Sequence, residues 1–227
     1  MRGQMPDYTL YYWPIPFRGH IIRYVLAQAG ANWDEPGADA LMALKSAPPA
    51  DQPYPFMAPP LLHDRGADRW LGQMPAIVMY LGRKHGLTGD PDTALRLVCD
   101  ASDILLEITR HHGEQMWVRA AWDEFSGARL PRWMQLHEAL AAGGRFDADT
   151  PGLAELTLAA LWHTMVDRLP GLRALLSTHA PTVEALADRV AALPRIAEML
   201  VRWDQPDAGY CGGQIEASLR AMLADPD

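Results

Sequence analysis

Over the first ninety residues, short runs of β-prone residues alternate with segments whose apolar positions have helical spacing. Residues 8–13 are rich in aromatic residues and end at Pro14, which has no amide hydrogen for a ladder, so they predict a strand. In residues 18–29 apolar side chains recur with the period of a helix, and Gly30 suits its end.

The remaining elements of this region continue the same alternation. A turn containing Gly66 separates two short apolar runs, which predicts a hairpin, and Pro75 suits the first turn of a helix. The elements expected here are a strand, a short helix, two hairpin strands and a helix, at residues 33–36, 41–45, 60–63, 69–71 and 75–86. The predicted order is therefore β-α-β followed by β-β-α.

After residue 90 the strand pattern disappears and helical spacing takes over. Residues 153–169 are apolar on nearly every side, which predicts a central, largely buried helix. The other predicted helices span residues 95–117, 131–142, 183–193 and 195–203, before a last amphipathic stretch near the end. We expect two domains, a mixed one at residues 1–89 and an all-helical one at residues 90–227.

Composition and charge exclude several classes of protein. The chain has 227 residues, of which 49% are hydrophobic and 21% charged, as in soluble globular proteins. No apolar run reaches the roughly 18 residues that span a bilayer, and the start lacks the pattern of a secretory signal. A net charge of −8 disfavours nucleic acid. These features predict a cytoplasmic protein with neither a membrane nor a nucleic-acid partner.

Cysteines and metal-ligand patterns are sparse. Cys99 and Cys211 form neither a C-x-x-C pair nor a spaced framework, which argues against a disulfide scaffold or a zinc site and favours a reducing compartment. His111 and His112 are adjacent, so on a helix they face different sides and do not readily bind one metal. No metal site is predicted.

Five segments, in order, resemble the cytosolic glutathione S-transferase superfamily. The opening YTLYYWPIPFRGHIIR is similar to that of the pi and mu classes, where an aromatic-tipped strand leads through a Pro/Gly loop into a helix with an arginine. The others are APPL at residues 58–61, QMPAI at residues 73–77, and the helical-domain segments at residues 151–156 and 181–200. The resemblance implies an α+β thioredoxin-like N-terminal domain (βαβ-ββα) and an all-α C-terminal helical-bundle domain.

The resemblance also implies an activity. A member would activate the thiol of glutathione, its co-substrate, for attack on a small hydrophobic electrophile, and would be a homodimer. Only the thiolate attacks well, and a phenol that donates a hydrogen bond to the sulfur anion lowers the pKa of the thiol. The family pattern places this catalytic tyrosine at Tyr12. Strand alternation alone leaves Tyr11 and Tyr12 equally able to point inward, so Tyr11 is the alternative.

Glutathione-binding residues follow from the same motifs. In the family, the residue before a cis-proline pairs its backbone with the cysteinyl part of glutathione, which would be Ala58 before a cis Pro59, with Pro60 as the competitor. Arg18 and Lys45 match basic positions near the glutathione carboxylates. Arg23, one helical turn after Arg18, is interpreted as a structural ion-pair former.

The γ-glutamyl carboxylate is expected at a helix N-terminus, whose free N–H groups and dipole suit an anion. Gln73 and Met74 stand at that position. Here the sequence departs from the family, because Met74 replaces the usual serine hydroxyl and Pro75 removes one N–H. This departure supports a rival hypothesis, a catalytically reduced member that binds ligands or has a structural role.

The electrophile pocket is expected between the two domains. Its plausible lining is Trp13, His111, His112, Met116, Trp117 and Tyr210, and of these Trp13, His112, Met116 and Tyr210 are the predicted site residues. A third hypothesis, a thioredoxin-like disulfide reductase, ranks last because it requires a redox cysteine after the first strand and residues 13–17 contain none.

Overall fold

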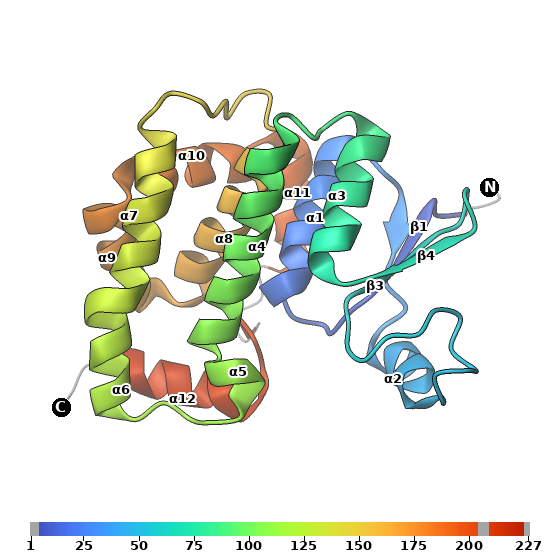
Figure 1. The fold of residues 1–227 in the computed structure, drawn as a ribbon, viewed down its shortest axis with the longest axis horizontal. Helices are drawn as coiled ribbons and strands as arrows, with labels where there is room; N and C mark the ends of the chain where they lie inside the picture. Colours follow the sequence, from blue (N-terminus) through green and yellow to red (C-terminus); the bar gives the residue numbers. More distant parts are fainter. Residues whose placement is uncertain (1–4, 204–208, 225–227) are drawn as a thin grey trace.

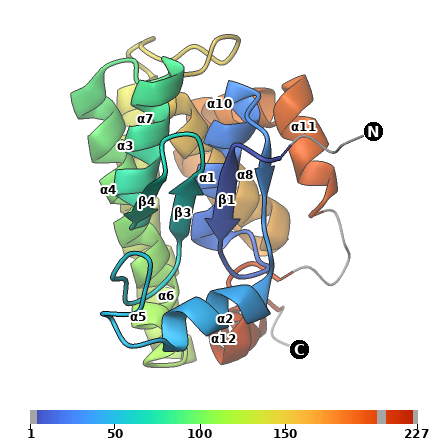
Figure 2. The ribbon, with the colours of Figure 1, turned by 90° about the vertical axis from the view of Figure 1, so that its right-hand side faces the viewer.

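A computed structural model describes residues 5–203 and 209–224. Within these residues the strands form one mixed sheet in the order β2-β1-β3-β4. They are β1 (Tyr8–Tyr11), β2 (Trp33–Asp34), β3 (Leu61–Asp64) and β4 (Arg69–Gly72). β1 pairs in parallel with β2 and antiparallel with β3, whose partner β4 completes the predicted hairpin. The strands lie side by side in Figure 2.

Three helices belong to the sheet-containing part of the chain. They are α1 (Phe17–Ala29), α2 (Ala38–Ser46) and α3 (Met74–His85). α1 and α3 pack side by side between the sheet and the helical part, whereas α2 lies apart from them (Figure 1). Gly30 and Gly86 end α1 and α3 in the left-handed conformation, which glycine adopts without a steric penalty. The predicted β-α-β, β-β-α order is confirmed.

From residue 91 onward the described chain is helical, as predicted. The elements are α4 (Pro91–Ile108), α5 (Arg110–Gly113), α6 (Arg119–Glu124), the π-turn η1 (Phe125–Arg129), α7 (Leu130–Ala141), α8 (Leu153–Arg168), the 3₁₀ turn η2 (Pro170–Leu172), α9 (Arg173–His179), α10 (Pro181–Ala191), α11 (Pro194–Val201) and α12 (Gly213–Leu223). No helix among the described residues has the length and apolar character needed to cross a membrane.

α8 is the central helix that its apolar pattern predicted. It packs against α1 and α3 of the first part and against α4 and α10 of the helical part. Trp162, in its middle, has no exposed surface. Because α8 contacts both parts of the chain, their two sets of apolar side chains form one continuous core.

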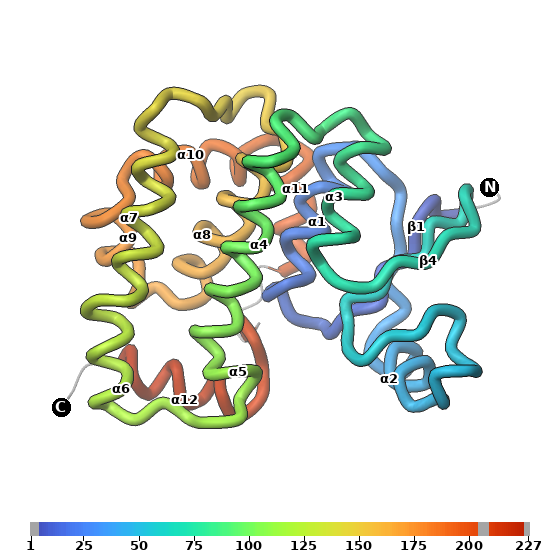
Figure 3. The backbone as a smooth tube through the Cα atoms, in the orientation of Figure 1, coloured from blue at the N-terminus to red at the C-terminus, as the bar shows by residue number. Residues whose placement is uncertain are grey.

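Two predicted helix boundaries are wrong. The segment 95–117 is not one helix, because α4 ends at Ile108 and the chain then makes a left-handed turn. The segment 131–142 begins earlier than expected, since α6, η1 and α7 run on from Arg119. Residues 109–115 contain no apolar side chain, so the apolar pattern is interrupted where α4 ends, and this interruption marks the boundary that the prediction passed over. The path is visible in Figure 3, where the chain turns below α4 before rising through α6.

Gly82 lets α3 and α8 approach closely, and a substitution there tests this contact. A Cβ atom at Gly82 would lie 2.3 Å from Cδ1 of Leu153, so we expect Gly82→Ala to lower the free energy of unfolding by about 1–3 kcal/mol, as overpacking does. Urea denaturation measures the change. The matched control is Gly127→Ala, another helical glycine with nothing within 4 Å, which should be neutral or slightly stabilising. Equal effects of the two substitutions would contradict the close contact.

Candidate functional site

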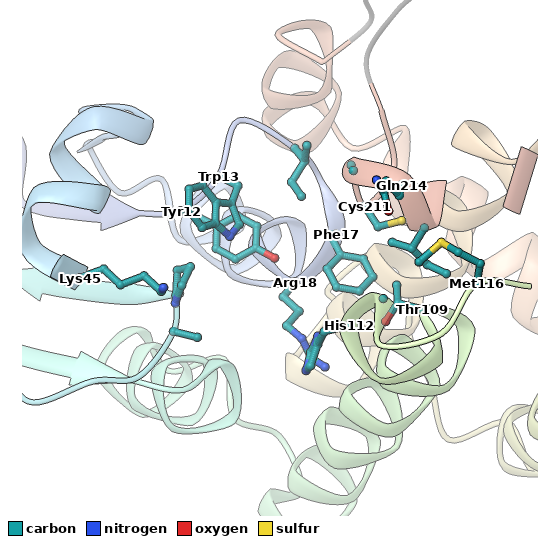
Figure 4. A pocket seen from close by; sticks show the side chains of 17 residues that line it. Tyr12, Trp13, Phe17, Arg18, Lys45, Thr109, His112, Met116, Cys211 and Gln214 are labelled. Carbon is teal, nitrogen blue, oxygen red and sulfur yellow. The ribbon is translucent and has the colours of Figure 1, made fainter. Parts of the chain in front are cut away.

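A cleft of about 810 Å³ lies between the sheet-containing part and the helical part. Its walls come from the loop after β1, the first turn of α1, α2, the loop before β3, the end of α4 with the turn after it, and residues 211–215. In Figure 4 Lys45 marks one end of the cleft and Met116, with Cys211, the other, with Tyr12 and Trp13 between them. Residues from both parts of the chain are therefore needed to form it.

Tyr12 follows the last residue of β1, and its hydroxyl points into the middle of the cleft (Figure 4). Its side chain is only 4% exposed. Burial raises the pKa of the phenol, although the positive charges of Arg18 and Arg23 and the backbone N–H groups of Arg18 and Gly19 act in the opposite direction. The phenol is therefore protonated at neutral pH and is able to donate its hydrogen to an anion.

Tyr11, the alternative, points elsewhere. Its ring stacks on Trp70 of β4 with a centroid distance of 5.7 Å, and it does not belong to the lining of the cleft. The tertiary structure thus separates two adjacent tyrosines that strand alternation treated alike.

Arg23 holds the loop that carries Tyr12. Its guanidinium is fully buried and makes two hydrogen bonds to the carboxylate of Glu35, at 2.9 and 2.6 Å. It also donates to the carbonyl oxygens of Ile15 (2.8 Å) and, at longer distances, of Pro16 and Trp13. Its Cζ atom lies 5.7 Å from the centre of the Tyr12 ring. Its interpretation as a structural ion-pair former is confirmed.

Gly19 makes this arrangement sterically possible. A Cβ atom at this position would lie 2.5 Å from Cδ1 of Tyr12 and 2.8 Å from Nη1 of Arg23. Such distances are below ordinary van der Waals contact, so the first turn of α1 passes the Tyr12 ring only because residue 19 has no side chain.

The predicted glutathione-binding residues are only partly brought together. Arg18, Lys45, Ala58 and Pro59 line the cleft. Gln73 and Met74 do not. Gln73 is an exposed residue at the start of α3 with φ of 69°, and its side chain does not cap the helix.

Met74 is a packing residue. Its side chain is 1% exposed and belongs to the hydrophobic core. The register of β3 with β4 pairs Leu61 with Gly72, so the start of α3 lies beside the segment that ends at Pro60. Any anion held there would be bound by backbone groups of α3, because Met74 presents no polar atom to it.

The position of the cis peptide bond corrects a prediction. The cis bond joins Pro59 to Pro60, so Pro60 is the cis residue and the assignment to Pro59 is wrong by one position. Either proline of the pair can adopt the cis form, and sequence spacing did not distinguish them. Pro59 is consequently the residue before the cis bond, and its backbone offers a carbonyl oxygen but no N–H.

Three of the predicted electrophile-pocket residues line the cleft. They are Trp13, His112 and Met116. Tyr210 does not line it: the side chain is 1% exposed, its ring packs edge-on against Phe17 at 5.6 Å, and its hydroxyl has no partner among the described residues. The prediction for Tyr210 is therefore corrected from lining to supporting the cleft wall through Phe17.

The same wall contains residues that sequence analysis missed. Phe17, Thr109 and the segment 211–215 line the cleft, and α12 begins within that segment. Glu216 accepts hydrogen bonds from the backbone N–H groups of Tyr210, Cys211 and Gly212, which fixes the turn into α12. Glu216 lies four residues after Gly212, one position beyond that of a capping box, so the sequence carried no standard signal for this contact. Burial raises the pKa of the Cys211 thiol to about 12, so this cysteine is protonated at neutral pH.

The turn after α4 has an unusual backbone. Arg110, His111 and His112 have φ values of 46°, 56° and 62°, and Gly113 follows with 82°. Each non-glycine residue in this left-handed region costs roughly 1–2 kcal/mol. Such conformations persist where surrounding contacts impose them, often at functional sites. Here the turn directs His112 and Gly113 to the cleft, while Arg110 and His111 line a separate cavity beside Trp117.

No group of three His, Cys, Asp or Glu residues in the described part of the chain could hold a metal ion. The groups in the cleft that could take part in chemistry include the buried phenol of Tyr12, the cations of Arg18 and Lys45 and the imidazole of His112, beside apolar walls.

Comparisons with known proteins identify relatives of the chain. Residues 93–222 match the family model described as "Glutathione S-transferase, C-terminal domain". The chain is 26% identical over 203 residues to glutathione S-transferase P 1 of Xenopus laevis, covering 86% of this chain and 92% of that protein. It is also 26% identical over 200 residues to the hematopoietic prostaglandin D synthase of Gallus gallus, covering 85% of this chain and 94% of that protein.

A solved structure shows the same fold. The pi-class glutathione S-transferase of Onchocerca volvulus superposes with a TM-score of 0.73 at 20% identity, covering 92% of this chain and 99% of that one. The expected combination of a thioredoxin-like N-terminal domain with an all-helical C-terminal domain is thereby confirmed.

Proposed function

Because the chain belongs to the glutathione S-transferase family, we propose that it is a glutathione transferase in which Tyr12 stabilises the glutathione thiolate for attack on a small hydrophobic electrophile. One observation carries this proposal: a buried, protonated phenol points into the middle of a cleft of about 810 Å³. A cleft of that size is at the upper end of the range that holds drug-sized ligands. It therefore has room for a tripeptide beside an acceptor.

Glutathione would occupy the half of the cleft toward α2. Lys45, exposed on α2, is placed to pair with a carboxylate, and Trp13, Ala58 and Pro59 form the adjoining wall. The cysteinyl sulfur would then lie near the Tyr12 hydroxyl. In this pose the phenol donates a hydrogen bond to the sulfur anion, which favours the charged form of the thiol and lowers its pKa.

The acceptor would occupy the other half. Phe17, Met116 and Ile215 give this half an apolar surface. The thiolate forms a carbon–sulfur bond with the electrophile. In a substitution the leaving group, chloride for a chloronitrobenzene, departs with its bonding electron pair, and the proton that the thiol loses goes to solvent. Tyr12 keeps its proton throughout, since its role is to donate a hydrogen bond.

The rival function is a ligand-binding protein of this fold with reduced catalysis. The observation that favours it is the placement of Met74 and Gln73, because neither side chain contributes a polar group to the cleft. The family pattern also implies a homodimer and a cytoplasmic location, and both stay predictions.

Calorimetric titration with glutathione separates the two functions. We expect saturable heat with a Kd below about 1 mM, which corresponds to a binding free energy of about −4 kcal/mol. Lys45→Gln should weaken binding severalfold by removing one exposed charge, whereas Arg189→Gln, which removes an exposed charge outside the cleft, should leave it unchanged. Absence of detectable heat at millimolar glutathione would contradict the transferase proposal and favour the ligand-binding protein.

A further inference from the structure

The charges in the cleft differ from those of the whole chain. The chain has a formal net charge of −8, yet the described residues that line the cleft include Arg18 and Lys45 and no aspartate or glutamate. The two cations lie in different halves of the cleft. Lys45 lies at the α2 end, whereas Arg18 lies beyond Tyr12, next to His112 and below Phe17 (Figure 4).

Arg18 has unused hydrogen-bonding capacity. A guanidinium carries five N–H donors, and among the described residues Arg18 makes one hydrogen bond, from Nη2 to the carbonyl oxygen of Ser102 at 3.3 Å. Asp103 acts on it electrostatically from the exposed side of α4 but forms no ion pair with it. Partial burial lowers the pKa of Arg18, and the phenols of Tyr12 and Tyr210 counteract this. Remaining donors are thus available to an oxygen anion that enters from the cleft.

Arg23 shows what a satisfied guanidinium looks like in the same helix. One turn further along α1, it is paired with Glu35 and donates to several backbone carbonyls. The two arginines lie on the same helix, so the unpaired N–H donors of Arg18 result from its position in the cleft.

His112 stands next to Arg18 at the rim of the cleft. The left-handed turn at residues 110–113 directs it there, at a backbone cost that a continuous α4 would not incur. Partial burial lowers the pKa of His112, and the positive charges of Arg18 and His111 lower it further. The negative charge of Glu114 raises it, but by less. A neutral imidazole adds no repulsion beside the guanidinium and still supplies one N–H donor.

We propose that the acceptor half of the cleft selects electrophiles that carry a carboxylate on an apolar body, with the carboxylate on Arg18 and a second hydrogen bond from His112. This inference rests on the proposed function, because the acceptor half is defined by where glutathione lies. Phe17, Met116 and Ile215 face the apolar body. A planar carboxylate matches the fork of a guanidinium, so the pair fixes the orientation of the electrophile toward the sulfur.

The test uses a matched pair of unreactive probes, 2-naphthoate and 2-naphthamide, which have the same shape and differ in charge. We expect calorimetry on the full chain to give a Kd about tenfold lower for 2-naphthoate, the lower range of a charge-assisted hydrogen bond. Equal affinities, or tighter binding of the amide, would overturn the proposal. Since neither probe requires turnover, this result is independent of catalysis.

Variants locate the anion. The preference is the ratio of the Kd for 2-naphthamide to the Kd for 2-naphthoate. Arg18→Met should reduce this ratio to near one, and Arg18→Lys should retain part of the preference because the charge remains. Lys45→Gln should keep the preference, and loss of it in this variant but not in Arg18→Met would place the carboxylate at the α2 end and contradict the proposal. Saturating glutathione should leave the preference intact, whereas competition would assign Arg18 to glutathione.

The adjacent histidines supply a matched control for the turn. His112→Leu should lower the preference severalfold, and His111→Leu, at a similar backbone conformation but facing the separate cavity, should not. Equal effects of the two would remove His112 from the proposal. Conjugation of an acid and an amide electrophile, 4-chloro-3-nitrobenzoate and 4-chloro-3-nitrobenzamide, then tests the selection of carboxylates separately from the proposed transferase function. Turnover without a preference for the acid overturns this inference alone, and probe preference without glutathione binding overturns the proposed function alone.

Discussion

Tyr12→Phe is expected to lower kcat/KM for conjugation about 100-fold, as removal of one hydrogen-bond donor to an anionic centre does in other enzymes. The substitution removes only the hydroxyl, so the ring keeps its packing against Gly19 and Arg23. Without that donor the sulfur anion loses a hydrogen bond in a partly desolvated cleft. The pKa of bound glutathione should therefore rise toward that of a free thiol.

Two measurements check this expectation. Steady-state kinetics with a chloronitrobenzene acceptor give kcat/KM, and the ultraviolet absorbance of the thiolate against pH gives the pKa of bound glutathione. Tyr11→Phe is the matched control, since Tyr11 stacks on Trp70 outside the cleft and should leave both quantities unchanged. A wild-type thiol pKa in Tyr12→Phe would reassign the activating group.

Arg23→Ala is expected to cause a large loss of stability, about 3–5 kcal/mol, as breaking a buried ion pair does. The substitution leaves Glu35 without its bidentate partner and removes the donor to the Ile15 carbonyl. It also removes the cation that packs over the Trp203 ring at 4.2 Å. Because these contacts hold the loop after β1, the position of Tyr12 should be lost together with stability.

Urea denaturation measures the free energy of unfolding, and kcat/KM at a temperature where the variant is folded measures the effect on the loop. Arg189→Ala is the control, because Arg189 pairs with Asp149 at 2.7 Å between two exposed side chains and should contribute less than about 1 kcal/mol. If Arg23→Ala were no worse than Arg189→Ala, Arg23 would not organise the loop.

These two experiments concern neighbouring parts of one structure. Tyr12 would perform the proposed chemistry, whereas Arg23 holds the loop after β1 and does not line the cleft. Gly19 packs against both residues, and no side chain fits at position 19 without a clash. A variant that lowers activity without changing stability therefore indicates Tyr12, and one that changes both indicates the support beneath it.

Most of the element order could be predicted from the sequence because it depends on local signals. Apolar periodicity and turn residues indicated the strands, the hairpin and most helices, including the buried α8. The shortfalls were also local in cause. Periodicity does not report the sign of φ, so the left-handed turn at residues 110–113 was missed, although the polar run 109–115 interrupts the apolar pattern there.

For the site, proximity in three dimensions was the missing information. Lys45, Ala58 and Met116 line the cleft as expected. Met74 is instead buried in the core, and Gln73 lies outside the cleft. The return of residues 211–215 to the cleft depends on packing across the whole helical part, which no local pattern encodes.

By itself, the amino-acid sequence determined the succession of elements, the family resemblance and the presence of a tyrosine at the end of the first strand. These depend on residue type and spacing along the chain. Only the tertiary structure decided that Tyr12 faces the cleft while Tyr11 does not, that the cis bond precedes Pro60, and that Arg18 lies beside His112 with donors to spare. The physical reason is that burial, dihedral sign and charge proximity arise from contacts between segments far apart in the chain.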